Sequence, residues 1–253
     1  LMNSPLPDKL NFRCLSYIKN KLPPESLVHS FLCYSAHLEL GLASAGHYVA
    51  AHTVKYPIYE FWHSVLSDPA RVHTLVEHLY PLESVHAFEA LQESWSTRRG
   101  QFMRSALFYL LIACSSQLSP SHGEFRKSAL TPMMLRRLKY FSSSKFYVMW
   151  DDSGDYLNSF SLDDGSHIAL FPVGKYTFNL FEEGKSRGPE CTLVNHHKLK
   201  EKLEGSLGKW IVVYKYHPRV LKEYKHYNIT MISKYGQPTK HEKMCEDIVI
   251  ANF

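Results

Sequence analysis

Cysteines, glycine-rich turns and long apolar runs are all scarce in this chain of 253 residues. Its five cysteines are scattered, odd in number and free of any Cys-x-x-Cys spacing, so the sequence indicates neither a disulfide framework nor a zinc site. The longest apolar run, Ala106–Cys114, is far shorter than the roughly 20 residues that span a bilayer. A charged-then-apolar leader is missing as well. We therefore expect a protein of a reducing cytoplasm that is neither secreted nor bound to a membrane.

Short motifs that carry common chemistries are also missing. The chain contains neither Gly-x-x-x-x-Gly-Lys-Ser/Thr nor Gly-x-Gly-x-x-Gly, which cradle phosphates, and no Gly-x-Ser-x-Gly elbow for a nucleophilic serine. Histidine pairs such as His196-His197 lack a third ligand at a recognised spacing, so we expect no metal. These absences disfavour nucleotide hydrolysis and serine-type hydrolysis. The net charge of +5 permits a polyanionic partner without requiring one.

One stretch near the N-terminus organises the rest of the chain. An apolar run at Leu27–Cys33, a helix-length segment at His37–Ser44 and a second apolar run at Tyr48–Val54 predict a strand, a helix and a strand. This order is typical of the opening of a parallel α/β sheet. A nucleotide would normally lie at the first turn of such a sheet. The glycines that a tight turn against a cofactor needs are replaced there by Tyr34-Ser35-Ala36.

A helical block is inserted between the predicted strands. Apolar residues at three- and four-residue steps predict packed helices from about Asp68 to Phe141. After this block we expect strands at Phe146–Trp150, His167–Phe171, Trp210–Tyr214 and Ile248–Ile250, with helices at Val194–Leu207 and Pro218–Tyr227. The sequence thus predicts an α/β domain of residues 1–67 and 142–253 and an inserted helical subdomain of residues 68–141. Because the strands are apolar throughout, helices should cover both faces of the sheet.

Several segments, taken in order, resemble one known family. They are Cys33-Tyr-Ser-Ala-His-Leu-Glu-Leu-Gly-Leu-Ala43, Pro57-x-x-Glu-Phe-Trp62, Arg104-x-Ala-x-Phe-Tyr109 and His241-Glu-x-x-x-Glu-Asp-x-Val-Ile-Ala-Asn252. The arrangement is similar to that of Dam-type adenine-N6 DNA methyltransferases, which use S-adenosylmethionine, and it covers roughly Phe12–Phe253. The resemblance implies a Rossmann-like methyltransferase sheet that is mostly parallel, with an inserted helical subdomain that resembles a DNA-recognition unit.

The positions that would bind the family's cofactor are degenerate in this chain. The first strand of the family ends in Pro-Phe-x-Gly-Gly-Gly, which holds the methionine part of S-adenosylmethionine. The matching cofactor positions here are Cys33, Tyr34, Ser35 and Ala36. An acidic residue of the family holds the ribose at the end of the second strand, where this chain has Thr53. The resemblance therefore implies no cofactor, or S-adenosylmethionine only if other groups have replaced these contacts.

The family's catalytic motif, Asp-Pro-Pro-Tyr, is changed as well. Its Asp accepts the adenine amino hydrogens and its Tyr stacks on the flipped base. The matching positions here are Phe171, Pro172, Val173 and Gly174. Tyr176 is close enough in sequence to serve as a relocated stacking ring. We expect Tyr34 and Phe171 to fill part of the cofactor crevice, because both rings replace small or polar residues. The loss of three elements together argues against methyl transfer.

Positive charge is concentrated in the second half of the predicted insertion. The residues concerned are Arg98, Arg99, Arg104, Arg126, Lys127, Arg136, Arg137 and Lys139. In the resembled family the insertion docks on DNA, so these side chains are candidates for phosphate and base contacts. The alternative interpretation is that they belong to ordinary solvated helix faces.

Two functions from different classes follow. The first is a catalytically inactive methyltransferase-like protein that binds DNA or a protein partner, such as a catalytic methyltransferase subunit or a second copy of itself. The second is a divergent but active S-adenosylmethionine-dependent DNA adenine-N6 methyltransferase. A virus or mobile element in a bacterial host or an infected cell is the setting that such divergence suggests.

Overall fold

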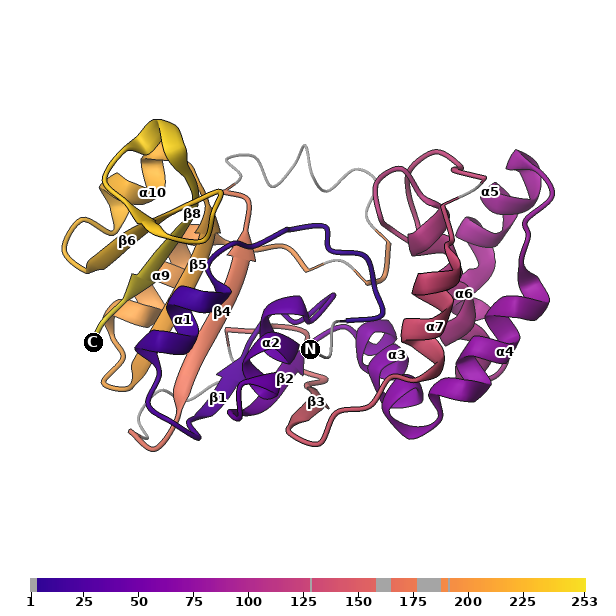
Figure 1. Cartoon of the computed structure of the whole chain (residues 1–253), viewed down its shortest axis with the longest axis horizontal. Coiled ribbons are helices and arrows are strands. Elements are labelled where there is room, and N and C mark those ends of the chain that lie inside the picture. Colours follow the sequence, from indigo (N-terminus) through magenta and orange to yellow (C-terminus); the bar gives the residue numbers. More distant parts are fainter. Residues whose placement is uncertain (1–3, 128, 158–164, 177–187, 191) are drawn as a thin grey trace.

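An eight-stranded mixed β-sheet forms the frame of the fold (Figure 1). The computed structural model describes residues 4–127, 129–157, 165–176, 188–190 and 192–253. The strands lie in the order β3-β2-β1-β4-β5-β8-β6-β7. In that order they are Phe146–Trp150, Tyr48–Thr53, Leu27–Ser30, Ile168–Gly174, Lys209–Lys215, Cys245–Ala251, Asn228–Ser233 and Pro238–Thr239.

The five neighbouring strands from β3 to β5 run parallel. β8 then lies antiparallel between β5 and β6, and β7 ends the sheet as a short antiparallel edge strand. The predicted α/β fold with a mostly parallel sheet is confirmed. The prediction missed β6 and β7, because β6 is half-exposed and mixes Asn228, Thr230 and Ser233 with its apolar residues. A strand of this composition lacks the apolar run that marks the buried strands.

Helices pack on the sheet and also form a block beside it (Figure 1). The helices at the sheet are α1 (Leu15–Lys21), α2 (His37–Ser44), α3 (Tyr56–Ser67), α9 (His196–Glu204) and α10 (Pro218–Glu223). The helical block contains α4 (Pro69–Leu79), α5 (Val85–Ser94), α6 (Gln101–Cys114) and α7 (Pro132–Lys139). Two short 3₁₀ turns are η1 (Trp95–Thr97) and η2 (Glu242–Met244). Within the described ranges, no helix is long and apolar enough to cross a bilayer.

Side-chain caps fix where several helices begin. Asp68 caps α4, since its carboxylate accepts a hydrogen bond from the backbone N–H of Arg71 at 3.0 Å and Pro69 occupies the first helical position. Thr131 and Asn195 cap α7 and α9 in the same way. The chain therefore turns from α3 into the helical block at Asp68, where the sequence places the start of the insertion.

Helix α3 joins the sheet to the helical block. Its Trp62 packs against Phe146 of β3 with ring centroids 5.3 Å apart, and its Phe61 packs against Phe108 of α6 at 5.0 Å. α6 is the central helix of the block, because every residue from Ser105 to Cys114 is buried. One continuous core thus runs from the sheet through α3 into the block.

One face of the sheet is open over β1, β2 and β3, as far as the described residues show. Val28 and Val49 pack with α2 in the core, while the alternate side chains on the other face include four large apolar ones that are 40–56% exposed. These four define the open sheet face: Leu27, Tyr48, Tyr147 and Met149. The prediction that both faces are covered is wrong for these strands. It is right for β4 and β5, on which α9 and α10 pack.

A histidine pair lies beside the open sheet face. Nδ1 of His29 on β1 and Nε2 of His52 on β2 are 2.8 Å apart, and the ring of His167 lies 4.6 Å from that of His29. Burial lowers the pKa of His52 to about 4, and the adjacent His29 adds to this because two imidazolium ions would repel each other. Burial, and then His167, lowers the pKa of His29 in the same way. The pair is therefore neutral at pH 7.

We expect the protein to lose stability as the pH falls from about 6.5 to about 4. The pKa of His52 in the folded state lies below its ordinary value, so its contribution is complete above the unfolded-state pKa and is lost as the pH falls through the folded-state pKa. Because the ring is only partly buried, the loss should be about 2 kcal/mol at most. Urea denaturation at several pH values measures it.

Two matched variants test whether this histidine pair, and not the other histidines, causes the pH dependence of stability. His52→Gln should flatten the pH dependence between these limits, because a neutral side chain cannot take up the proton. His86→Gln should leave it unchanged, since the His86 side chain is 97% exposed. An unaltered dependence in His52→Gln would assign it to other groups.

Candidate functional site

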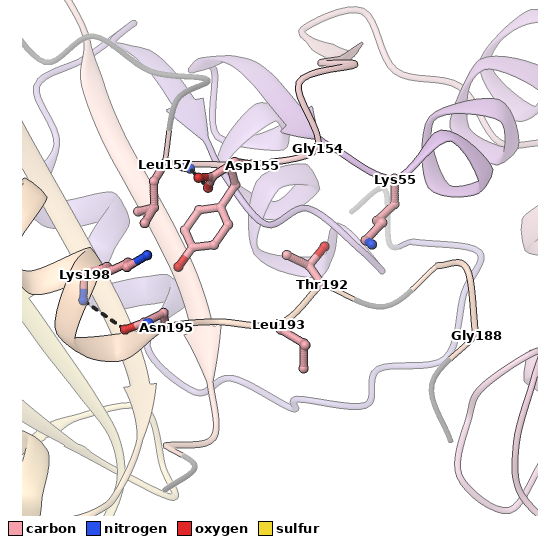
Figure 2. Close-up of a pocket in the computed structure, with 10 residues that line it drawn as sticks. Lys55, Gly154, Asp155, Leu157, Gly188, Thr192, Leu193, Asn195 and Lys198 are labelled. Atoms are coloured by element: carbon pink, nitrogen blue, oxygen red, sulfur yellow. Dashed lines mark hydrogen bonds between the residues drawn. The ribbon is translucent and has the colours of Figure 1, made fainter. Parts of the chain in front are cut away.

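Two cavities lie at the carboxyl ends of the strands where the strand order reverses. β2 and β3 lie on one side of β1, and β4 and β5 lie on its other side. The strand order therefore reverses between β1 and β4. In open α/β sheets, ligands bind outside the carboxyl ends of the strands at such a point. The smaller cavity, which we call the β1–β4 cavity, has a volume of about 210 Å³. The larger one, the β3–α9 cavity, has a volume of about 450 Å³ (Figure 2).

The β1–β4 cavity is small and mostly apolar. Its walls include Leu10 of the N-terminal segment, Ile58 of α3 and Val194 before α9. A buried carboxylate, Glu190, also lines it and accepts hydrogen bonds from the hydroxyls of Ser119 and Ser121 at 3.1 and 2.9 Å. Sites for small molecules usually measure about 300–1,000 Å³. The cavity is therefore small for a cofactor of nucleoside size.

The β1–α2 turn adopts a glycine-like backbone without any glycine. Leu32 has φ = 71° and Ala36 has φ = 54°, both in the left-handed region. A Cβ atom in this region costs about 1–2 kcal/mol per residue relative to the right-handed one. The turn thus keeps a conformation that glycines would adopt without strain, while the side chains of Leu32 and Tyr34 extend into the β1–β4 cavity wall.

The predicted cofactor positions are engaged in packing and turn contacts. Cys33 is buried, and burial raises the pKa of its thiol well above the ordinary value, with Glu39 adding to the effect. The carbonyl of Tyr34 accepts a hydrogen bond from Nε1 of Trp62 at 2.8 Å. The Thr53 hydroxyl accepts one from the backbone N–H of Lys55 at 3.1 Å. Thr53 is thus part of a turn, and it offers no carboxylate to a ribose.

Phe171 lies in the hydrophobic core and lines neither cavity, which corrects the prediction that its ring fills part of a cofactor crevice. Its side chain is fully buried, stacks on Phe31 at 5.2 Å and packs in the core below α9. The next two residues of β4, Pro172 and Val173, reach the end of the strand and line the β1–β4 cavity. Tyr34 also lines this cavity.

Gly174 occupies a position where a tyrosine would be strained. Its φ of 83° lies in the region that favours glycine, and the pairing of β4 with β5 shifts register there. A Cβ atom on Gly174 would lie 2.6 Å from a methyl group of Leu10. The N-terminal segment therefore packs against Gly174, the position that the resemblance matches to the family's stacking ring.

Tyr176, the predicted relocated stacking ring, is stacked on protein side chains. His196 and His217 lie parallel to it, with centroids 4.5 and 5.0 Å away, and its hydroxyl donates to Glu223 at 2.9 Å. Burial, and then the Glu223 carboxylate, raises the pKa of Tyr176 to about 12. These imidazoles occupy the ring surface that a flipped base would need.

Seven of the predicted basic residues form three exposed groups, and the eighth, Arg104, is half-buried in an ion pair. The groups are Arg98 and Arg99 before α6, Arg126 and Lys127 after α6, and Arg136, Arg137 and Lys139 on α7. Because α6 has 14 residues, the first two groups are separated by about 20 Å. Arg104 is different, since its Nε donates to Oε1 of the buried Glu60 at 2.7 Å. It therefore belongs to the packing of α6 on α3.

The β3–α9 cavity was not predicted from the sequence. It is lined by Lys55 after β2, Tyr156 and Asp155 after β3, and Asn195 and Lys198 at the start of α9 (Figure 2). These residues come from segments separated by up to about 140 positions, so no local motif unites them. The one local signal is Asn195, whose helix-capping pattern places a helix start at this edge of the sheet.

The sequence matches no family model and no curated protein. The resemblance to Dam-type methyltransferases therefore rests on the segments named above alone. Within the described residues, no group of three or more His, Cys, Asp or Glu side chains is arranged to hold a metal ion.

Proposed function

We propose that the chain is a methyltransferase-like protein that does not transfer methyl groups and that binds DNA through its helical block. The absence of methyl transfer is inferred from the structural roles of the residues at the motif positions. Phe171 fills the core, Gly174 allows the chain to bend, and Thr53 stabilises a turn. No reacting group of the resembled family has a counterpart at these three places.

The sheet supports a Rossmann-like relationship. The order from β3 through β1 to β5 is that of the first five strands of the doubly wound fold. The antiparallel β8 between β5 and β6 departs from the all-parallel dinucleotide-binding sheet. We infer a methyltransferase-type variant of the fold, interrupted between β2 and β3 by the helical block. A cytoplasmic location is part of the proposal.

The charge of the helical block supports DNA as the partner. Arg136, Arg137 and Lys139 project from the last turn of α7 and are exposed. Among the described side chains, none of these three forms an ion pair with a carboxylate, so their charge is available to phosphates. The open sheet face offers a second surface, and its apolar residues favour a protein partner as the alternative.

We expect Arg136→Ala together with Arg137→Ala to weaken DNA binding with little dependence on sequence. Each lost phosphate contact should lower the slope of log affinity against log salt by about one, so the pair should lower it by about two. Fluorescence anisotropy of a labelled mixed-sequence duplex, measured between about 50 and 200 mM salt, gives this slope.

A matched control removes two lysines elsewhere. Lys222→Ala with Lys225→Ala deletes the same charge from an exposed region at α10 and should leave the slope unchanged. Equal losses in both double variants would mean that net charge alone matters. Absence of binding by wild-type protein at low salt would favour the protein partner.

An active methyltransferase is the second candidate, and one observation favours it. The β1–α2 turn retains the backbone conformation that a glycine motif would give, and the β3–α9 cavity lies next to it across Thr192, which lines both cavities. Calorimetric titration with S-adenosylmethionine separates the two proposals. Binding in the micromolar range would support the enzyme, and no heat at millimolar ligand would support the inactive protein.

A further inference from the structure

We propose that the β3–α9 cavity binds the phosphate group of a mononucleotide or of a phosphate ester of similar size. The proposal does not depend on DNA binding by the helical block, because none of the basic residues of that block lines this cavity. The volume of about 450 Å³ lies within the range of about 300–1,000 Å³ that small-molecule sites occupy. The location, at the carboxyl ends of β2 and β3, is also the edge at which open α/β sheets bind ligands.

The charged groups of the cavity favour an anion. Lys55, from the segment between β2 and α3, and Lys198, from the first turn of α9, approach it from opposite sides (Figure 2). In the described part of the chain, the ion pairs of α9 are formed by His197 and Lys200, and Lys198 forms none. Asp155 is the one carboxylate among the lining residues, so the two ammonium groups outweigh it.

The start of helix α9 adds backbone donors to this charge. Asn195, the capping residue, and Lys198 both line the cavity, so the amino end of the nine-residue helix is directed at it. The first N–H groups of a helix have no acceptor within the helix, and its dipole favours an anion at this end. Asn195 accepts from the N–H of Lys198 at 3.0 Å, which fixes the helix start in place.

A buried hydroxyl without a partner is the independent sign of a ligand. Tyr156 is 6% exposed and lines the cavity, and its hydroxyl makes no hydrogen bond of good geometry with the described residues, although the backbone N–H of Asn195 lies near it. Such a group is costly to bury unless something accepts its proton. Burial, with Asp155 next, raises the pKa of Tyr156, so the hydroxyl stays a donor at neutral pH. A phosphate oxygen would satisfy it.

The remaining walls suit the organic part of a nucleotide. Leu157 and Leu193 present apolar side chains, while Thr192 supplies a hydroxyl between the lysines (Figure 2). A flat base packs well against aliphatic side chains, and a sugar needs polar partners. A nucleoside 5′-monophosphate combines the anion, the sugar and the base in one molecule of suitable size.

Calorimetric titration of the full chain with AMP, adenosine and inorganic phosphate tests this inference. AMP should bind, and adenosine should bind at least about tenfold more weakly, because it lacks the charged group. Lys198→Ala should weaken AMP binding about tenfold or more. Lys202→Ala, on the same helix but outside the cavity, is the matched control and should bind AMP like the wild type.

Tyr156→Phe separates a ligand contact from a structural role. Loss of the unsatisfied hydroxyl should raise the thermal midpoint of the free protein, yet weaken AMP binding severalfold. A purely structural tyrosine would give a lower midpoint and unchanged affinity. The proposal is overturned if AMP does not bind, if Lys198→Ala matches Lys202→Ala, or if only a single-stranded oligonucleotide binds in a Lys198-dependent manner.

Discussion

Replacing Phe171 by Asp is expected to unfold the protein instead of creating a methyltransferase. The ring is fully buried on β4, stacked on Phe31 and packed against the core residues below α9. Deleting a buried phenyl ring costs about 3–5 kcal/mol, and a carboxylate buried in its place costs several kcal/mol more. The sum is comparable with the whole stability of a typical domain, about 5–15 kcal/mol.

Circular dichroism and urea denaturation of Phe171→Asp check this expectation. The matched variant, Phe171→Leu, keeps an apolar side chain and should cost about 1.5 kcal/mol or less. A folded Phe171→Asp protein of near wild-type stability would mean that the ring is less confined than its burial indicates.

The same variants should show no methyl transfer. An Asp at Phe171 would replace one acceptor, while Thr53 and Gly174 would still lack the ribose carboxylate and the stacking ring. When several residues of a site act together, restoring one of them does not restore activity. An assay with tritiated S-adenosylmethionine and mixed-sequence DNA, on protein free of host methyltransferase, measures this. Stoichiometric methylation of adenine by the wild type would replace the inactive interpretation with the enzyme.

Strand positions and helix starts could be predicted because the residues of the segment itself determine them. The apolar run at Leu27–Cys33 predicted a strand, and β1 lies within it. The helical block was expected to start at about Asp68, and Asp68 caps its first helix. Coverage of a sheet face is different. Tyr48 and Tyr147 look like core residues in the sequence, but their exposure depends on which helices cross over β2 and β3. That arrangement is tertiary, so an apolar run could not reveal it.

The candidate sites were harder to predict for the same reason. The resemblance pointed to Cys33 and Phe171, yet the direction of the Phe171 side chain follows from the register of β4 with β5. Lys55 and Lys198 carry no local signal, because a cavity forms from residues that only the chain topology brings together. Arg104 was a candidate for DNA contact because of its charge. The sequence shows this cation but does not show that the buried Glu60 is its partner.

Arg104→Ala should destabilise the helical block by about 3 kcal/mol or more. Its guanidinium forms two hydrogen bonds with Glu60 of α3, whose side chain is 5% exposed, and donates a third to the carbonyl of Arg98 at 2.7 Å. Removing one partner leaves the other charge buried and unpaired, which typically costs about 3–5 kcal/mol. The partly exposed Arg104 side chain places this case near the lower end. Urea denaturation measures the loss directly.

Matched variants distinguish a structural arginine from one that contacts DNA. Arg99→Ala removes the same charge from an exposed position and should change stability by about 0.5 kcal/mol or less. Glu60→Met combined with Arg104→Met should regain much of the stability lost in Arg104→Ala, because no unpaired charge stays buried. Since Arg104 holds α6 against α3, its folded variant should bind DNA with nearly the wild-type salt slope. An Arg104→Ala protein of full stability and much weaker DNA binding would instead make Arg104 a phosphate ligand.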